Sequence, residues 1–203
     1  MFRAFAAIAS DYPGVLLGLA TAVCVLASAA TIALFRRAQV STATGQTIWL
    51  GSAATVGGCG FWAVHAILMP LYLPGVIAGS DPSFVAMSLT LAIAAVGLGL
   101  GLVLRSDAQV TVVIGGLIFG GGIAVMHHTG LSALELPGHL SSSPSLGVLA
   151  LMLASGLGCI GLAFAARGCD LFRSAAAAAF LAVAVMAHHL TVMHAIVFTA
   201  DPA

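Results

Sequence analysis

Six apolar stretches, each long enough to cross a lipid bilayer as a helix, occupy most of this 203-residue chain. They cover residues 14–35, 47–73, 84–104, 110–135, 145–166 and 174–199. A membrane-spanning helix needs about 20 such residues. Charged residues make up only 6% of the chain, whereas a soluble domain carries roughly 25%. The pattern therefore predicts an all-α, polytopic membrane protein with about six transmembrane helices in a lipid bilayer.

The connections between these stretches are short and rich in Gly, Pro, Ser and Arg, so we expect one integral membrane domain over residues 1–203. The first stretch contains Ala27-Ser28-Ala29, which is similar to a signal-peptide cleavage site. It continues to Phe35, however, and is longer than the core of a signal peptide. We interpret it as the first transmembrane helix and keep cleavage as a minor alternative.

Charge and cysteine content exclude several classes of function. Six basic and six acidic residues balance, so the chain has no basic patch for nucleic acid. The four cysteines form no CxxC pair, so neither a zinc site nor a disulfide framework is indicated. The sequence shows no Ser-His-Asp set, no paired-carboxylate site and no phosphate-binding loop, and we do not expect an enzyme.

The distribution of arginine predicts the orientation. The loops after the first, third and fifth stretches hold Arg36, Arg37, Arg105, Arg167 and Arg173, whereas the opposite side holds Arg3. Cytoplasmic loops carry an excess of basic residues. We therefore expect a multi-pass protein of the plasma membrane with these three loops in the cytoplasm and both termini outside.

A repeat of 62 residues runs through the chain. His65, His127 and His189 follow one another at this interval, as do Arg105 and Arg167. The unit is a pair of helices, so the chain reads as three parallel repeats over approximately 14–75, 84–138 and 145–201. Because each unit has an even number of spans, the second, fourth and sixth helices run in the same direction. Their histidines then lie at one depth, in the outer third of the bilayer.

The repeated element carries side chains that bind metals. It reads VHAILM at 64–69, MHHTGL at 126–131 and HHLTVM at 188–193. In two copies a methionine follows the histidine by four residues, which places both on one helix face. Imidazole and thioether ligands together suit Cu(I). The predicted metal ligands are His65, Met69, Met126, His127, His189 and Met193, with His128, His188 and His194 as secondary candidates.

Other interpretations of these histidines stay open. Ionisable groups inside a membrane are costly and usually functional, but they also serve as hydrogen bonds between helices. A transporter for copper or another small solute would need polar groups along a route through the membrane. A haem-binding oxidoreductase subunit would use two histidines as axial ligands, and a Soret absorption band would reveal it.

The segment MHHTGL, which follows GGGIAV, resembles the signature of the MHYT domain, a bacterial inner-membrane sensor domain. The resemblance extends over nearly the whole chain and is strongest in the middle copy. The family's histidines fall on His65, His127 and His189, and its first methionine falls on Val64, Met126 and His188. In the third copy an alternative register takes Met193-His194.

The resemblance implies a copper site and the sensing of a diatomic gas such as oxygen, CO or NO. The family usually adds a seventh helix and cytoplasmic output domains of the GGDEF and EAL types. These 203 residues hold neither, so we expect a separate cytoplasmic signalling partner.

Overall fold

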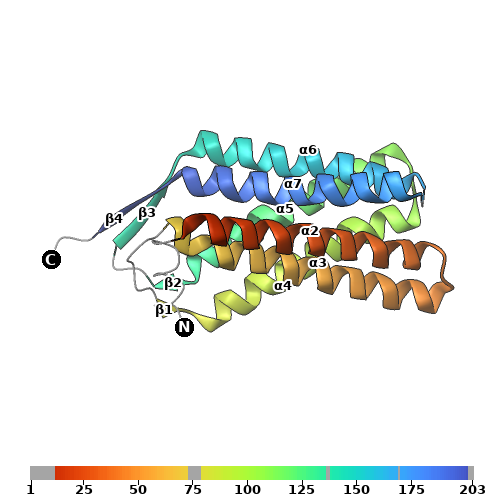
Figure 1. Cartoon of the computed structure of the whole chain (residues 1–203), viewed down its shortest axis with the longest axis horizontal. Coiled ribbons are helices and arrows are strands. Elements are labelled where there is room, and N and C mark those ends of the chain that lie inside the picture. The colour runs from red at the N-terminus through yellow and green to blue at the C-terminus, as the bar shows by residue number, and fades with distance from the viewer. Residues whose placement is uncertain (1–11, 73–78, 136–137, 169, 201–203) are drawn as a thin grey trace.

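The computed structural model describes residues 12–72, 79–135, 138–168 and 170–200, and this part of the chain forms a bundle of six long helices. In the labels of Figure 1 they are α2 (Pro13–Gln39), α3 (Ala43–Tyr72), α4 (Pro82–Arg105), α5 (Gln109–Ser132), α6 (Pro144–Ala166) and α7 (Leu171–His194). All six are long and apolar enough to span a membrane. The predicted all-α fold with six transmembrane helices is confirmed.

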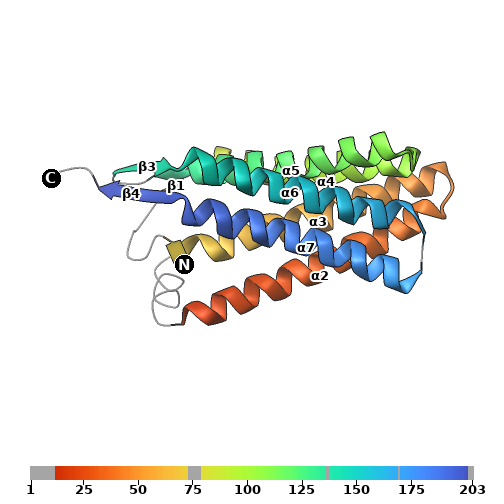
Figure 2. The ribbon, with the colours of Figure 1, turned by 90° about the horizontal axis from the view of Figure 1, so that it is seen from above.

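The helices form a closed ring in chain order, because α7 packs against α2 as well as against α6. Within this ring, α3, α5 and α7 each contact the other two, and they make an inner triangle. These are the three helices that carry the repeated histidines. Figures 1 and 2 show the bundle in two views, with the described strands gathered at one end. We call this end the histidine end, and the opposite end, with Arg36, Arg37, Arg105, Arg167 and Arg173, the arginine end.

Proline and aspartate start the helices. Pro13, Pro82 and Pro144 each stand in the first turn of a helix, where a missing backbone N–H has no consequence. The side chains of Asp81 and Asp170 accept hydrogen bonds from backbone N–H groups at the starts of α4 and α7. Such caps satisfy donors that the first helical turn leaves free.

Two of the apolar runs extend past the ends of their helices. The run 110–135 continues beyond α5 into strand β2 (Leu134–Glu135), and the run 174–199 continues beyond α7 into strand β4 (Ile196–Ala200). Hydrophobicity alone does not distinguish a short strand from one more helical turn. The β-branched residues Ile196, Val197 and Thr199 favour the extended chain.

These strands repeat the 62-residue interval. Strand β2 pairs antiparallel with β1 (Gly79–Ser80), and β4 pairs antiparallel with β3 (Gly138–Ser142). The pair Gly79 and Glu135 in the first sheet corresponds to the pair Ser141 and Val197 in the second, 62 residues later on both strands. The connections at the histidine end are therefore as much part of the repeat as the helices are.

Glycines allow the hairpins to pack closely. A side chain at Gly58 on α3 would meet the backbone of Ile93 on α4, and a side chain at Gly120 on α5 would meet the backbone of Ser155 on α6. The two positions are again one repeat apart. At the third junction the equivalent residue is Ala182 on α7, whose backbone carbonyl accepts a hydrogen bond from the Cys24 thiol on α2. Small residues permit such backbone contact between helices in lipid.

Candidate metal centre

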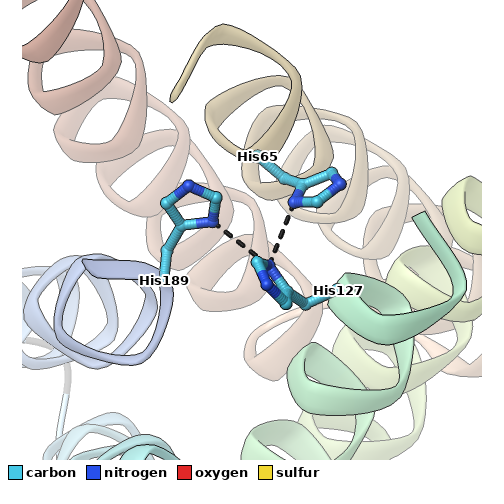
Figure 3. A group of neighbouring side chains, drawn as sticks. All are labelled: His65, His127 and His189. Atoms are coloured by element: carbon cyan, nitrogen blue, oxygen red, sulfur yellow. Dashed lines mark hydrogen bonds between the residues drawn. The ribbon is translucent and has the colours of Figure 1, made fainter. Parts of the chain in front are cut away.

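Three histidine rings meet on the axis of the inner triangle. His65 comes from α3, His127 from α5 and His189 from α7, and each side chain is at most 3% exposed. The Nδ1 atom of His127 lies 3.0 Å from Nδ1 of His65 and 3.2 Å from Nδ1 of His189. Figure 3 shows the three rings converging from their separate helices. We call this group the histidine triad.

The repeat explains why the three rings meet. Since α3, α5 and α7 run in parallel, positions 62 residues apart lie at equal heights. The rings cross nearly at right angles, with centroids 4.7, 4.9 and 5.5 Å apart. No backbone group of the described residues makes a hydrogen bond to these rings. They are held by packing in the core of the bundle, which also contains Phe61, Val64 and Met126.

A small cavity adjoins the triad on its arginine-end side. Its lining follows the repeat in three layers: the triad itself, then Val64, Met126 and His188, then Phe61, Ile123 and Val185. The space holds about one water-sized sphere. Its deepest layer is entirely apolar and fully buried.

The absence of a side chain at Gly130 on α5 leaves the space that the ring of His65 occupies. A Cβ atom at Gly130 would collide with Nε2 of His65. The equivalent positions in the other copies are Leu68 and Val192, so only the middle copy has this gap. Sequence reasoning did not single out Gly130, although it belongs to the MHHTGL segment that carries the family resemblance.

The structure places the predicted methionines differently from one another. Met126 is 2% exposed and lines the cavity beside the triad. Met193 is buried and Met69 is half-buried, one turn beyond their histidines towards the histidine end. Neither of these two is part of the cavity lining.

The three secondary histidine candidates differ in burial and in their distance from the triad cavity. His188 is 1% exposed and lines the cavity. His128 is exposed at the outer surface of α5, beside a second groove formed with β2, β3 and β4. His194 is exposed, donates from Nδ1 to the Leu190 carbonyl and lies edge-on to the ring of Tyr72. Of the two registers for the third copy, the one with His189 therefore brings an imidazole to the triad.

The three Nδ1 atoms cannot all be satisfied by bonding to one another. A neutral imidazole has one N–H donor and one lone pair on its two nitrogens. If Nδ1 of His127 is protonated, its one N–H can donate a good hydrogen bond to only one of the two neighbouring rings. If it is not protonated, its one lone pair can accept a hydrogen bond from only one of them. A cation accepts all three lone pairs at once. The Nε2 atoms of the triad make no hydrogen bond to any other described residue, and such buried polar atoms are costly in a membrane.

Two of the three Nδ1 separations in the triad are close to those that one metal ion needs. Nitrogen ligands lie about 2.0–2.1 Å from zinc, so three of them on one ion are about 3.3–3.6 Å apart. The two Nδ1 separations of 3.0 and 3.2 Å are a few tenths of an ångström shorter. Among the described residues, these three histidines are the group whose ligand atoms lie close enough to share an ion, within 4.8 Å of one another. Imidazole is a ligand for copper, zinc, iron and nickel alike.

Comparison with known proteins connects this site to a family. Residues 120–178, which include His127, match the family model described as MHYT, bacterial signalling protein N-terminal repeat. Residues 120–178 are thus similar to an MHYT repeat. The match begins in α5 and ends in α7, so it covers the junction between α5 and α6.

Two curated bacterial proteins resemble this chain over most of its length. An uncharacterized signaling protein of Caulobacter vibrioides is 26% identical over 182 residues, 90% of this chain. The bifunctional diguanylate cyclase/cyclic di-GMP phosphodiesterase MucR of Pseudomonas aeruginosa is 27% identical over 151 residues, 72% of this chain. This chain covers only 22% of the length of each relative. No solved structure matches it.

Proposed function

We propose that this chain is a membrane-embedded sensor module that holds one copper ion between His65, His127 and His189. The observation that carries the proposal is the convergence of three buried Nδ1 atoms from three parallel helices. The family supports a signalling role, since the matching family model is that of a bacterial signalling protein.

The cavity supports copper among the metals that imidazole binds. Besides the three nitrogens, its lining offers the thioether of Met126, and soft sulfur ligands select Cu(I). When bound, copper would supply a coordination site for a small gas such as oxygen, CO or NO. The chain's own residues would orient the three imidazoles, exclude water and leave space for one small ligand.

The same geometry favours a sensor over the two alternative functions. A transporter needs a passage with polar groups, but the layer beneath the triad consists of Phe61, Ile123 and Val185. A haem needs a pocket for a macrocycle, whereas this cavity holds about one water-sized sphere. A single ion with a small exogenous ligand fits the space.

We also propose a cytoplasmic signalling partner for the module. The relative from Pseudomonas aeruginosa is described as a diguanylate cyclase and cyclic di-GMP phosphodiesterase, and this chain matches about a fifth of its length. A change of packing among the three hairpins would be the message that passes to such a partner.

Copper content tests the proposal. The detergent-purified chain, loaded with Cu(I) and passed over a desalting column, is expected to retain about one copper per chain. His127→Ala is expected to lose most of it, because His127 is the ring that contacts both others. His65→Ala and His189→Ala should weaken binding about tenfold or more, because losing even a group that only supports a metal ligand typically costs about 10–100-fold in affinity.

His194→Ala is the matched control, because His194 is an exposed histidine five residues from His189 on the same helix. It should retain the wild-type copper content. Equal copper in the wild type and in the His127→Ala variant would end the copper proposal.

A further inference from the structure

One position of the repeat differs in chemistry between the three copies. Next to each triad histidine stands Val64 in the first copy, Met126 in the second and His188 in the third. All three line the cavity, and His188 is 1% exposed. Neither ring nitrogen of His188 makes a hydrogen bond to another described residue. The third copy thus adds a buried polar group to an otherwise mostly apolar lining, and the backbone of Ala150 on α6 is within interaction range of its ring.

His188 and His189 are placed for different roles. Consecutive residues on a helix project in directions that do not face each other, so both rings do not reach the same ion from the same side. His189 contacts Nδ1 of His127 directly. The ring centroid of His188 lies 5.7 Å from that of His127, at 86°, and the ring borders the cavity instead.

We propose that His188 donates a hydrogen bond to a small ligand in this cavity and makes the site selective for ligands that accept one. This inference rests on the proposed copper site. A neutral imidazole keeps one N–H donor, and the other residues outside the triad that line the cavity have no N–H or O–H group in their side chains. His188 therefore discriminates in favour of acceptors such as dioxygen or a one-atom anion, and against CO, which accepts hydrogen bonds weakly. Hydrogen-bond donors in a ligand pocket tune gas binding in this way.

Two probes of suitable size test the role of His188. Fluoride is a one-atom hydrogen-bond acceptor whose binding to Cu(II) is followed by its superhyperfine splitting in electron paramagnetic resonance. Carbon monoxide binds Cu(I) and is followed by its infrared stretching band. The variant His188→Met places at this position the residue that the middle copy already has, and His188→Gln keeps an N–H donor.

The expected result is a split between the two probes. In His188→Met, fluoride affinity falls about tenfold to a hundredfold, the effect of losing a hydrogen bond to an anion, while CO affinity changes less than about threefold. His188→Gln keeps most of the fluoride affinity. His128→Met, which changes the neighbouring exposed histidine, leaves both affinities at the wild-type level.

Each remaining outcome contradicts the inference. Unchanged fluoride affinity in His188→Met shows that the ring does not reach the ligand. Loss of copper from both His188 variants, with His128→Met intact, shows that His188 is a metal ligand instead. Copper held through the triad but with no His188 effect overturns the selectivity alone, whereas a wild-type chain that takes up no copper overturns the proposed function with it.

Discussion

At the scale of single residues, the geometry of the histidine triad depends on a residue with no side chain at all, Gly130. His65 fits beside His127 because Gly130 leaves the space that any larger residue would fill. The collision would be with the ring itself, which has little freedom in a core packed at this density. The glycine therefore controls the geometry of an imidazole on another helix.

Gly130→Ala is expected to displace the ring of His65 and to weaken copper binding about tenfold, with little effect on folding. Copper retention by the purified chain measures this effect. Gly121→Ala is the control on the same helix, because a side chain there would meet nothing within 4 Å. Equal loss of copper in both variants would show that α5 tolerates no alanine in general, and that Gly130 has no special role.

The triad itself was predictable from the sequence, and its surroundings were only partly so. Equal spacing of three histidines in parallel helices determines their relative height, and the structure brings these three together. The spacing of Met69 and Met193 showed a shared helix face but not on which side of the triad the cavity lies. Phe61, Ile123 and Val185 also follow the 62-residue interval, so the repeat held a signal for the cavity that was not used.

At the scale of elements, the hairpins are joined through glycines that the repeat preserves. Gly58 and Gly120 bring α3 onto α4 and α5 onto α6 at equivalent heights. These contacts lie two turns before the triad histidines, on two of the three helices that carry the triad. The sequence alone does not distinguish the adjacent glycines Gly120 and Gly121, of which only Gly120 faces a neighbouring helix, whereas a side chain at Gly121 would meet nothing within 4 Å.

Gly120→Leu is expected to lower the unfolding temperature of the detergent-solubilised chain by about 5 °C or more, since overpacking costs about 1–3 kcal/mol. Gly121→Leu, one residue further along α5, should change it little. Circular dichroism of α-helix content on heating measures both. A smaller effect at Gly120 than at Gly121 would contradict the assigned packing.

At the scale of the whole molecule, hydrogen bonds from one arginine join α2 to α6 and α7 at the arginine end. Arg36 on α2 donates hydrogen bonds to the carbonyls of Phe164 and Ala165 on α6 and to the Ser174 hydroxyl on α7. A cation at the end of a helix is favourable for the exposed carbonyls there. The first and third hairpins are thus connected at the end opposite to the triad.

The orientation of the bundle is a prediction from its arginines, and cysteine labelling tests it. In a chain whose native cysteines are replaced by serine, Ser141→Cys on β3 should react with a membrane-impermeant maleimide added to spheroplasts. Thr42→Cys, between α2 and α3, should react only after the membrane is opened. The reverse pattern would place the arginine end outside.

Within the described residues, the junction between α7 and α2 differs from the other two because no loop joins these two helices, which meet through packing and hydrogen bonds. The ring of three hairpins is therefore not closed by a covalent connection, and an ion bound by all three would link the first hairpin to the last. We expect release of the ion, or a change in its coordination, to loosen the packing between α7 and α2 before it affects the junctions between α3 and α4 or between α5 and α6. The change would reach the hydrogen bonds that Arg36 makes to α6 and α7 at the arginine end of the bundle.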